Sequence, residues 1–297
     1  MLRSVRELPL IIRRTRPQGE IVSMMRVVCL ALAALVSLPG CKPAAPPPEP
    51  APSLDDSPSP VQESVSYLKD DPKVHGYLCR PDREGASAAV LIIHDRMGLT
   101  EGIKDETFRL ARDGYVVLAV DLYRGQTPKT AKDAERLERE LPKKRALDDL
   151  KSAVDYLSER PEVRSEEKNP KSKNLGVLGL GMGGVYALDL ALVDPRLRAV
   201  ALCYCPLSID AEQLMTLKAT VFGVFAGRDK NVPPDVIERF SKAMYKAGKR
   251  MDAIRVYGDS PHGFLDPADW PTYGEPSQKD VGEVWELITR YFDRELS

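Results

Sequence analysis

One short segment of the sequence has the form of a turn that presents a nucleophile. The segment Gly-Leu-Gly-Met-Gly-Gly, residues 179–184, lies between an apolar run and a helix-like run. A strand, a tight glycine turn and a helix in this order can expose a Ser or Cys in the middle of the turn. The middle residue here is Gly181, which has no side chain. A covalent intermediate therefore cannot form at this position, because it needs an oxygen or sulfur nucleophile.

An acid and a histidine follow the turn in the order that a nucleophile–acid–histidine triad needs. Asp229 ends one predicted strand, and His262 follows the next one. A carboxylate beside an imidazole orients the ring and makes it a better base. Asp95 ends an earlier predicted strand, directly after His94, which we expect to support the loop at Asp95 through hydrogen bonds. Asp229 and His262 are either a working pair or a pair that now only packs, and the sequence leaves both readings open.

The elements that position these residues are apolar runs alternating with helical patterns. Leu147, Leu150, Val154 and Leu157, for example, recur on one face of a helix. The predicted strands cover residues 88–95, 115–123, 174–180, 197–205, 220–229 and 252–259. The helical patterns cover residues 105–114, 145–157, 183–192, 233–248 and 280–292.

This alternation predicts one α/β domain with a mostly parallel, doubly wound sheet flanked by helices on both faces. Residues 64–69 and 74–80 predict an antiparallel pair of strands at the edge of the sheet. Chemistry in such folds lies at the carboxyl ends of the strands, where the candidate residues occur.

The glycine turn and the segments around Asp95, Asp229 and His262 occur in one order and at one spacing, and through them the sequence from about residue 65 to 295 resembles the dienelactone hydrolase family of α/β-hydrolases. The resemblance implies an α/β-hydrolase fold and hydrolysis of carboxylic esters or lactones. We expect no cofactor, and no metal-binding spacing of Cys or His appears. Four blocks carry the resemblance in order: IIHDRMGLTEGIKDETFRLARDGYVVLAVDLYRG, GLGMGG, FAGRDKNVP and YGDSPHGF.

Carried over residue by residue, the resemblance assigns roles to four positions. His262 falls on the triad histidine, Asp229 on the triad acid and Gly181 on the nucleophile. Asp95 falls where the family has a Glu that handles the thiol of the nucleophile. Asp266 stands where the carboxylate-lactone enzymes of the family have an Arg, so the resemblance argues against dienelactone itself as the substrate.

Backbone groups of an oxyanion hole can remain where the nucleophile is missing. We expect the amide of Met182, with an amide near Asp95 or Arg96, to point into such a hole. An oxyanion hole and substrate binding alone can accelerate hydrolysis by about 10³-fold over water.

Two other routes to hydrolysis stay open. Cys205, at the end of the strand expected beside the glycine turn, is a speculative relocated nucleophile, as are Ser208 and Ser260. Cys203 and Cys205 alternate with Tyr204, so we expect them to face the same side as free thiols, or simply to be small core residues. Alternatively, His262 backed by Asp229 activates a water, for which the absent side chain leaves room.

The first 41 residues read as a targeting segment and are excluded from the fold. Translation can begin at Met24 or Met25, followed by Arg26 and an apolar run from 27 to 36 that is too short to span a membrane. Leu-Pro-Gly-Cys, ending at Cys41, resembles a bacterial lipoprotein signal in which the cysteine is lipidated. An ordinary cleaved signal peptide is the alternative.

The residues after Cys41 predict a spacer between an anchor and a folded domain. Residues 42–60 contain eight prolines, so they cannot form a helix or a sheet. We place the tether at 42–62 and the hydrolase-like domain at 63–297. The expected location is the bacterial cell envelope, lipid-anchored to a membrane through Cys41, in the periplasm or on the surface.

The composition of the chain argues against nucleic acid as a partner. The net charge of −1 gives no reason to expect nucleic acid as a partner. The glycine turn is not a dinucleotide fingerprint, because no acidic residue ends a strand about 20 residues later. Three functions remain: a degenerate hydrolase or binder of a small carbonyl-containing molecule, an active ester or lactone hydrolase, and a protein-interaction module.

Overall fold

The computed structural model describes residues 58–68, 71–72, 74–165, 173–249 and 254–297. The signal segment expected at 1–41, with Cys41, and most of the tether expected at 42–62 lie outside these residues. The first strand begins at Val61, two residues before the domain start expected at residue 63.

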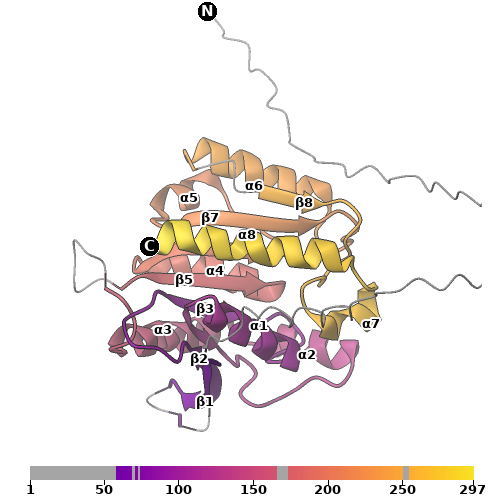
Figure 1. Ribbon diagram of the computed structural model, residues 1–297. Coiled ribbons are helices and arrows are strands. Elements are labelled where there is room, and N and C mark those ends of the chain that lie inside the picture. Colours follow the sequence, from indigo (N-terminus) through magenta and orange to yellow (C-terminus); the bar gives the residue numbers. More distant parts are fainter. Residues whose placement is uncertain (1–57, 69–70, 73, 166–172, 250–253) are drawn as a thin grey trace, which may run out of the picture. The chain divides into compact units, whose positions relative to one another are not determined.

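The described residues form an eight-stranded sheet in the order β1-β2-β4-β3-β5-β6-β7-β8. The pairs β1–β2 and β2–β4 are antiparallel and all other neighbours are parallel (Figure 1). The strands are β1 (Val61–Ser66), β2 (His75–Arg80), β3 (Ala89–Ile93), β4 (Val116–Ala119), β5 (Leu175–Leu180), β6 (Leu197–Cys203), β7 (Thr220–Ala226) and β8 (Ile254–Tyr257).

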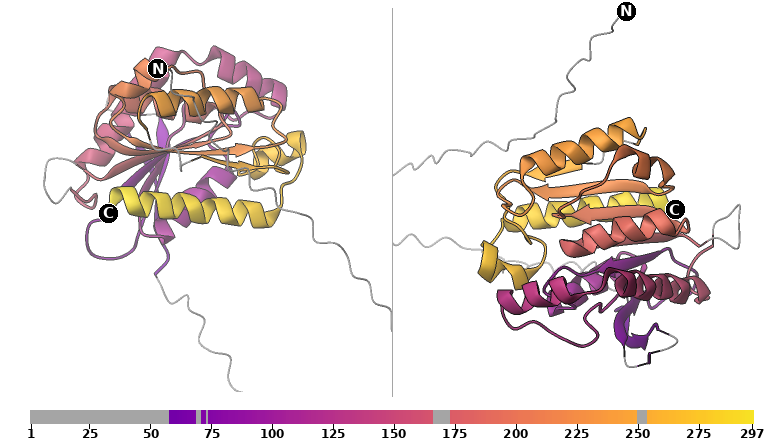
Figure 2. Two further views of the ribbon diagram at one scale, coloured as in Figure 1. Left: turned by 90° about the horizontal axis from the view of Figure 1, so that it is seen from above. Right: turned by 180° about the vertical axis from the view of Figure 1, so that it is seen from behind.

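Helices cover both faces of the sheet, as Figure 2 shows for α6 and α8. The helices α1 (Glu101–Arg112) and α8 (Gln278–Leu296) pack on one face. The other face carries α3 (Lys143–Glu159), α4 (Met182–Val193), α5 (Ala211–Thr216) and α6 (Pro234–Lys246). In the part of the chain that the structure describes, the remaining elements are α2 (Ala131–Glu140), η1 (Pro267–Asp269) and α7 (Trp270–Tyr273). The predicted doubly wound α/β fold, with its antiparallel edge pair, is confirmed.

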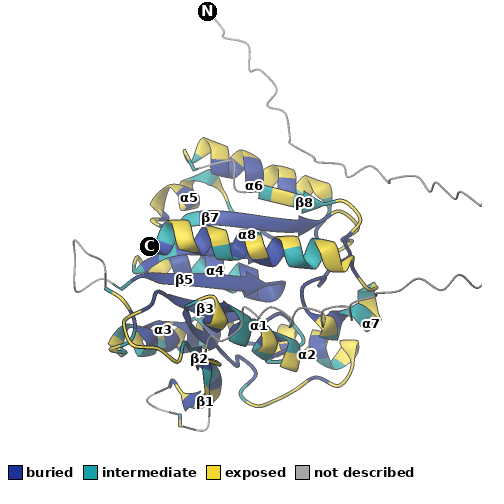
Figure 3. Cartoon of the chain, in the orientation of Figure 1, coloured by how far each residue is buried: buried dark blue, intermediate teal, exposed yellow. Residues whose placement is uncertain are grey.

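The central strands are buried along their whole length because helices shield both of their faces. Every residue of β3, β4 and β5 is buried, whereas the helices expose their outer sides (Figure 3). This explains why these strands read as continuous apolar runs rather than alternating ones. In the described part of the chain, no helix is both long and apolar enough to cross a membrane.

One prediction about the strand ends is wrong. The prediction that Cys203 and Cys205 face the same side assumes that the strand continues through Tyr204. Instead β6 ends at Cys203, and Tyr204 has φ +39°. The turn places Cys203 in the core under α8 and Cys205 in the core under α3 and α4. Both thiols are free and buried, as predicted, and the thiol of Cys79 is free and buried as well.

Candidate functional site

The glycine turn between β5 and α4 has a backbone conformation that would strain a residue with a side chain, and its central residue has none. Gly181 has φ +51° and ψ −119°, and its amide donates to the carbonyl of Cys203 at 3.0 Å. A Cβ added there would lie 2.9 Å from Cβ and 3.6 Å from Oδ2 of Asp95. A Cβ on Gly183 would lie 2.2 Å from the carbonyl oxygen of Ile93, so close packing against β3 requires glycine in the turn. The turn therefore has the sharp geometry of a nucleophile elbow without a nucleophile.

The acid and the histidine meet as the sequence predicts. His262 Nδ1 lies 2.7 Å from Asp229 Oδ2, and both residues are buried. The other oxygen of Asp229 accepts from the amides of Asn231 at 2.7 Å and Val232 at 3.1 Å. These amides fix the carboxylate, and the carboxylate fixes the imidazole with Nδ1 toward it. The geometry therefore leaves Nε2 as the nitrogen that can take a proton.

Two tyrosines hold the imidazole from its sides. The ring centroid of His262 lies 5.4 Å from that of Tyr204 and 4.8 Å from that of Tyr273, both edge-on. Tyr273 Oη accepts from the side-chain amide of Asn231 at 3.1 Å. The guanidinium of Arg96 lies over the Tyr273 ring, 4.9 Å from its centroid. The segment that carries Tyr273 thus forms one wall around His262.

The loop after β3 brings Asp95 and Arg96 to the glycine turn. Asp95 Oδ1 accepts from the amide of Met97 at 2.7 Å. His94 supports the loop as predicted: its Nδ1 lies 2.5 Å from the carbonyl oxygen of Asp95, and its Nε2 accepts from the amide of Leu122 at 3.1 Å. Burial lowers the pKa of His94, so its ring is neutral and acts as a structural support.

Two backbone amides are free to bind a carbonyl oxygen. Met182 is the first residue of α4, where helix amides have no intrahelical acceptor. Within the described ranges, neither the Met182 amide nor the Arg96 amide donates to an acceptor. The hydroxyl of Tyr123 joins the two loops, donating to the Arg96 carbonyl at 3.1 Å and contacting Met182 Sδ at 3.4 Å. These residues suit the oxyanion role that the sequence suggests for them.

Three buried acidic side chains, Asp95, Asp266 and Asp269, lie near the site, and sequence reasoning missed Asp269. Asp269 and Asp95 are both buried, and neither carboxyl oxygen of Asp269 has a hydrogen-bond partner among the described residues. Burial raises the pKa of both carboxyls. Burial and the nearby Asp95 raise the pKa of Asp266 to about 6, although Asp266 accepts from Thr100 Oγ1 at 3.1 Å and from the Ala268 amide at 2.9 Å. Asp266 is thus a buried cap of η1 rather than a charge facing a ligand. Asp269 has no sequence signal beyond its position seven residues after His262.

Cys205 has the wrong surroundings for a nucleophile. Its side chain is fully buried and packs against α4, so that a Cβ on Gly184 would lie 2.7 Å from its Sγ. Burial also raises the pKa of its thiol, which keeps it protonated. Of the other candidates, Ser260 is buried and bonded to Asp280, and Ser208 is exposed. The geometry supports none of the three.

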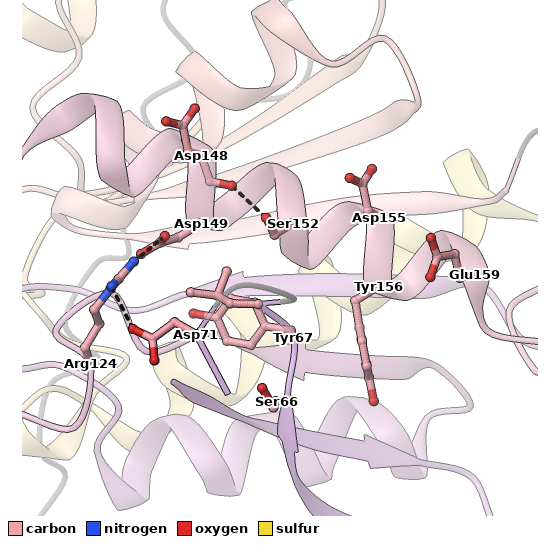
Figure 4. A pocket seen from close by; sticks show the side chains of 11 residues that line it. Ser66, Tyr67, Asp71, Arg124, Asp148, Asp149, Ser152, Asp155, Tyr156 and Glu159 are labelled. Atoms are coloured by element: carbon pink, nitrogen blue, oxygen red, sulfur yellow. Dashed lines mark hydrogen bonds and ion pairs between the residues drawn. The ribbon is translucent and has the colours of Figure 1, made fainter. Parts of the chain in front are cut away.

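A cavity of about 530 Å³ opens at His262. Its lining residues are Arg228, Lys230, Asn231, Pro261, His262, Thr272 and Tyr273. A second cavity, of about 570 Å³, lies beside α3 and shares no lining residue with the first. There Arg124 reaches Asp71 at 3.1 Å and Asp149 at 2.8 Å (Figure 4). Among the side chains that the structure describes, no cluster of three His, Cys, Asp or Glu is arranged to hold a metal ion.

Comparison with protein-family profiles identifies the family of this chain. A sequence profile described as the dienelactone hydrolase family matches residues 74–296. A protein of Aquifex aeolicus with a provisional carboxymethylenebutenolidase name is 28% identical over 241 residues, 77% of this chain and 97% of that protein. A solved dienelactone hydrolase-like promiscuous phosphotriesterase from metagenomic libraries aligns with a TM-score of 0.70 and 18% identity, over 81% of this chain and 100% of that one. A dienelactone hydrolase from Anabaena variabilis aligns with a TM-score of 0.59 and 20% identity, over 80% and 100%. At these identities the two structures show a shared fold.

Proposed function

Because the chain belongs to the dienelactone hydrolase family, we propose that its site is a degenerate hydrolase site that binds a small carbonyl-containing molecule without covalent chemistry at the elbow. The observation that carries the proposal is Gly181. The turn keeps the φ of +51° that an elbow uses, yet it offers no atom that could attack a carbonyl carbon. The matched family profile supports the ancestry of the site.

Several groups that would recognise a carbonyl remain in place. The unpaired amides of Met182 and Arg96 can donate to a carbonyl oxygen. The cavity at His262 has room for a small molecule and offers Tyr273 and Asn231 as further polar contacts. Since these contacts need no nucleophile, binding can persist where acyl transfer is lost.

A second function, hydrolysis by an activated water, is favoured by the 2.7 Å contact between His262 Nδ1 and Asp229 Oδ2. In this route Nε2 of His262 takes a proton from a water as the water oxygen bonds to the ester or lactone carbon. The tetrahedral intermediate then collapses, its C–O bond to the leaving oxygen breaks, and the proton passes from the imidazolium to that oxygen. The products are an acid and an alcohol, joined in one molecule when a lactone opens.

An assay of the purified full chain on activated esters and lactones separates these functions. The degenerate site predicts no turnover by the parent, turnover and an acyl adduct on residue 181 for Gly181→Cys, and neither for Gly181→Ala. Gly181→Ala is the matched control because it adds the Cβ, with its contact to Asp95, but no nucleophile. Parent turnover that His262→Ala abolishes, with no adduct by intact mass spectrometry, would replace the proposal with the water route.

Binding is measured on the same proteins by a thermal-shift screen of lactones, esters and ketones. A stabilising compound whose effect disappears in His262→Ala supports a small-molecule site. No stabilisation by any compound, together with no gain of activity in Gly181→Cys, favours the remaining alternative of a protein-interaction module.

We further propose that the domain belongs to a lipoprotein of the bacterial envelope. The support is the sequence alone: a short apolar run, Leu-Pro-Gly-Cys ending at Cys41, and the proline-rich residues that follow. A lipid on Cys41 would make the membrane a partner and would hold the domain in the periplasm or at the surface.

A further inference from the structure

The cavity at His262 has two cationic side chains and no acidic one among its lining residues. The two cations are Arg228 and Lys230, which lie on either side of Asp229 in the sequence. Both are exposed, and no ion pair joins either of them to a carboxylate of the described residues. The whole chain has 44 acidic and 43 basic residues, so its average composition does not explain this surplus. The cavity therefore offers unpaired positive charge to a ligand.

The acid between the two cations is not available to pair with them. Asp229 is 6% exposed, and its oxygens are taken by His262 Nδ1 at 2.7 Å and by two backbone amides at 2.7 and 3.1 Å. Its side chain is therefore turned into the protein, whereas those of Arg228 and Lys230 are exposed. Asp266 is also buried, and it accepts from a threonine hydroxyl at 3.1 Å.

Backbone hydrogen bonds fix the loop that carries the two cations. The amide of Gly227 donates to the carbonyl of Tyr257 at 2.7 Å, and the amide of Arg228 donates to the carbonyl of Ser260 at 3.1 Å. These bonds join the loop after β7 to the end of β8 and to the loop that carries His262. The fold therefore sets where the two cations stand relative to His262.

A third cation lies against one wall of the cavity. The guanidinium carbon of Arg96 is 4.9 Å from the centroid of the Tyr273 ring, and its Nε has no hydrogen-bond partner among the described residues. Tyr273 lines the cavity and accepts from the side-chain amide of Asn231 at 3.1 Å. Because Arg96 adds its charge to those of the loop after β7, this side of the site attracts anions.

We propose that the cavity binds a small carbonyl compound that carries a phosphate monoester, and that Arg228 and Lys230 hold the phosphate. The inference rests on the proposed function, because it takes the carbonyl group to bind at the amides of Met182 and Arg96. A guanidinium presents a planar fork of N–H donors to two phosphate oxygens, and an ammonium presents three more donors. A phosphate monoester has three terminal oxygens and a charge of about −1.5 to −2 at pH 7, so it matches two cations better than one carboxylate does. The cavity, of about 530 Å³, has room for such a molecule.

This phosphate position differs from the place where the resemblance would put an anion. The carboxylate-lactone enzymes of the family have an Arg at the position of Asp266, which is here a buried acid bonded to Thr100. The cations of this chain lie instead on the loop after β7. An anionic group would therefore enter from the side of Arg228 and Lys230.

Isothermal titration calorimetry on the purified full chain tests the inference with four probes. They are dihydroxyacetone phosphate, dihydroxyacetone, inorganic phosphate and the keto acid levulinate. Dihydroxyacetone phosphate should bind at least about tenfold more tightly than dihydroxyacetone, which has the same carbonyl group and no charge. It should also bind more tightly than levulinate, which has one carboxylate, and than inorganic phosphate, which has no carbonyl group. Added sodium chloride should weaken its binding, because both cations are exposed to solvent.

Substitutions on the loop assign the binding to the two cations. Arg228→Gln and Lys230→Gln should each weaken binding of dihydroxyacetone phosphate by about three- to tenfold and leave binding of dihydroxyacetone unchanged. Lys151→Gln removes a cation from the exposed side of α3 and is the matched control, so it should bind all four probes as the parent does.

The outcomes separate this inference from the proposed function. Equal binding of dihydroxyacetone and its phosphate, lost in His262→Ala, would keep the carbonyl site and overturn the role of the cations. Inorganic phosphate binding as tightly as dihydroxyacetone phosphate, and losing affinity in Arg228→Gln, would support the cations and overturn the carbonyl site. Failure of both phosphate probes to bind, or binding that neither loop substitution weakens, would overturn the inference.

Discussion

At the scale of single residues, Gly181 has the backbone conformation of a nucleophile elbow but no side chain that could act as a nucleophile. A residue with a side chain at φ +51° carries about 1–3 kcal/mol of backbone strain. Enzymes tolerate such strain because the elbow exposes the nucleophile. Once no nucleophile is needed, glycine removes the strain while the surrounding contacts hold the turn in its shape.

We expect Gly181→Ala to lower the free energy of unfolding by about 1–3 kcal/mol, because Ala brings backbone strain at this φ. Its Cβ must also displace Asp95, whose Cβ would be 2.9 Å away. Urea denaturation measures the change. Gly282→Ala is the control: the position lies in α8 with no atom within 4 Å of an added Cβ. At position 282 the substitution to Ala should raise the free energy of unfolding by up to about 1 kcal/mol. Equal effects of the two substitutions would contradict this account of the elbow.

The raised pKa of the Asp266 carboxyl determines how this residue contributes to stability as the pH changes. Its pKa is raised to about 6 by burial and by Asp95, whereas an unfolded Asp has a pKa of about 3.9. The folded state therefore binds more protons than the unfolded state between these values, so the contribution of Asp266 to stability falls as the pH rises from about 4 to about 6. As the pH rises over this range, the free energy of unfolding of Asp266→Asn should increase by up to roughly 3 kcal/mol relative to that of the parent. Urea denaturation at several pH values checks this, and parallel profiles for the two proteins would refute it.

At the scale of elements, Thr100 joins α1 to the segment after His262. Its Oγ1 accepts from the Ile103 amide at 3.2 Å as the N-cap of α1, and it donates to Asp266 Oδ2 at 3.1 Å. The same hydroxyl therefore caps the first turn of α1 and holds η1 through its hydrogen bond to Asp266. This contact links α1, which packs on one face of the sheet, to the wall of the site.

Thr100→Ala should cost about 1–2 kcal/mol, since it removes both the cap and the bond to Asp266. A double-mutant cycle with Asp266→Ala should give a coupling energy of at least about 0.5 kcal/mol. Thr130 caps α2 in the same way through the Asp133 amide and does not contact Asp266, so it is the matched control. The cycle of Thr130→Ala with Asp266→Ala should be additive. Additive behaviour of the Thr100 cycle would show that the cap and η1 are independent.

The sequence predicts helices and strands well where apolar residues recur over a long segment. It predicts them poorly where tertiary contacts determine the local conformation. The helices α3 and α8 and the buried strands follow from repeated apolar positions. The helices α2 and α7 are short or strongly polar and have little apolar pattern to detect. Tyr204 adopts φ +39°, so β6 stops before Cys205 and the two thiols lie on opposite sides of the sheet.

The pairing of Asp229 with His262 follows from their order at strand ends. The burial of Asp269 against Gly263 depends on the path of the chain after His262, which no local pattern encodes.

At the scale of the folded domain, the parallel sheet explains why residues so distant in sequence meet. The loops after β3, β5, β7 and β8 bring Asp95, Gly181, Asp229 and His262 to one end of the sheet. Because the strands are buried on both faces, substitutions in these loops change the chemistry without changing the fold. The fold can therefore persist when the middle residue of the glycine turn has no side chain.

At the scale of the whole chain, a lipid on Cys41 would attach the protein to a membrane. If Cys41 is lipidated, the chain expressed in a bacterium should partition with membranes and incorporate a fatty-acid label. Stable anchoring takes two lipid signals, so a diacylated cysteine is sufficient, whereas the apolar run from 27 to 36 is too short to span the bilayer. Cys41→Ser should abolish both the label and the membrane association. Cys29→Ser, inside the same apolar run, is the control and should change neither. A soluble, unlabelled chain cleaved near residue 41 would show instead that the segment is an ordinary signal peptide, and the proline-rich residues would then be a free N-terminal extension rather than a tether.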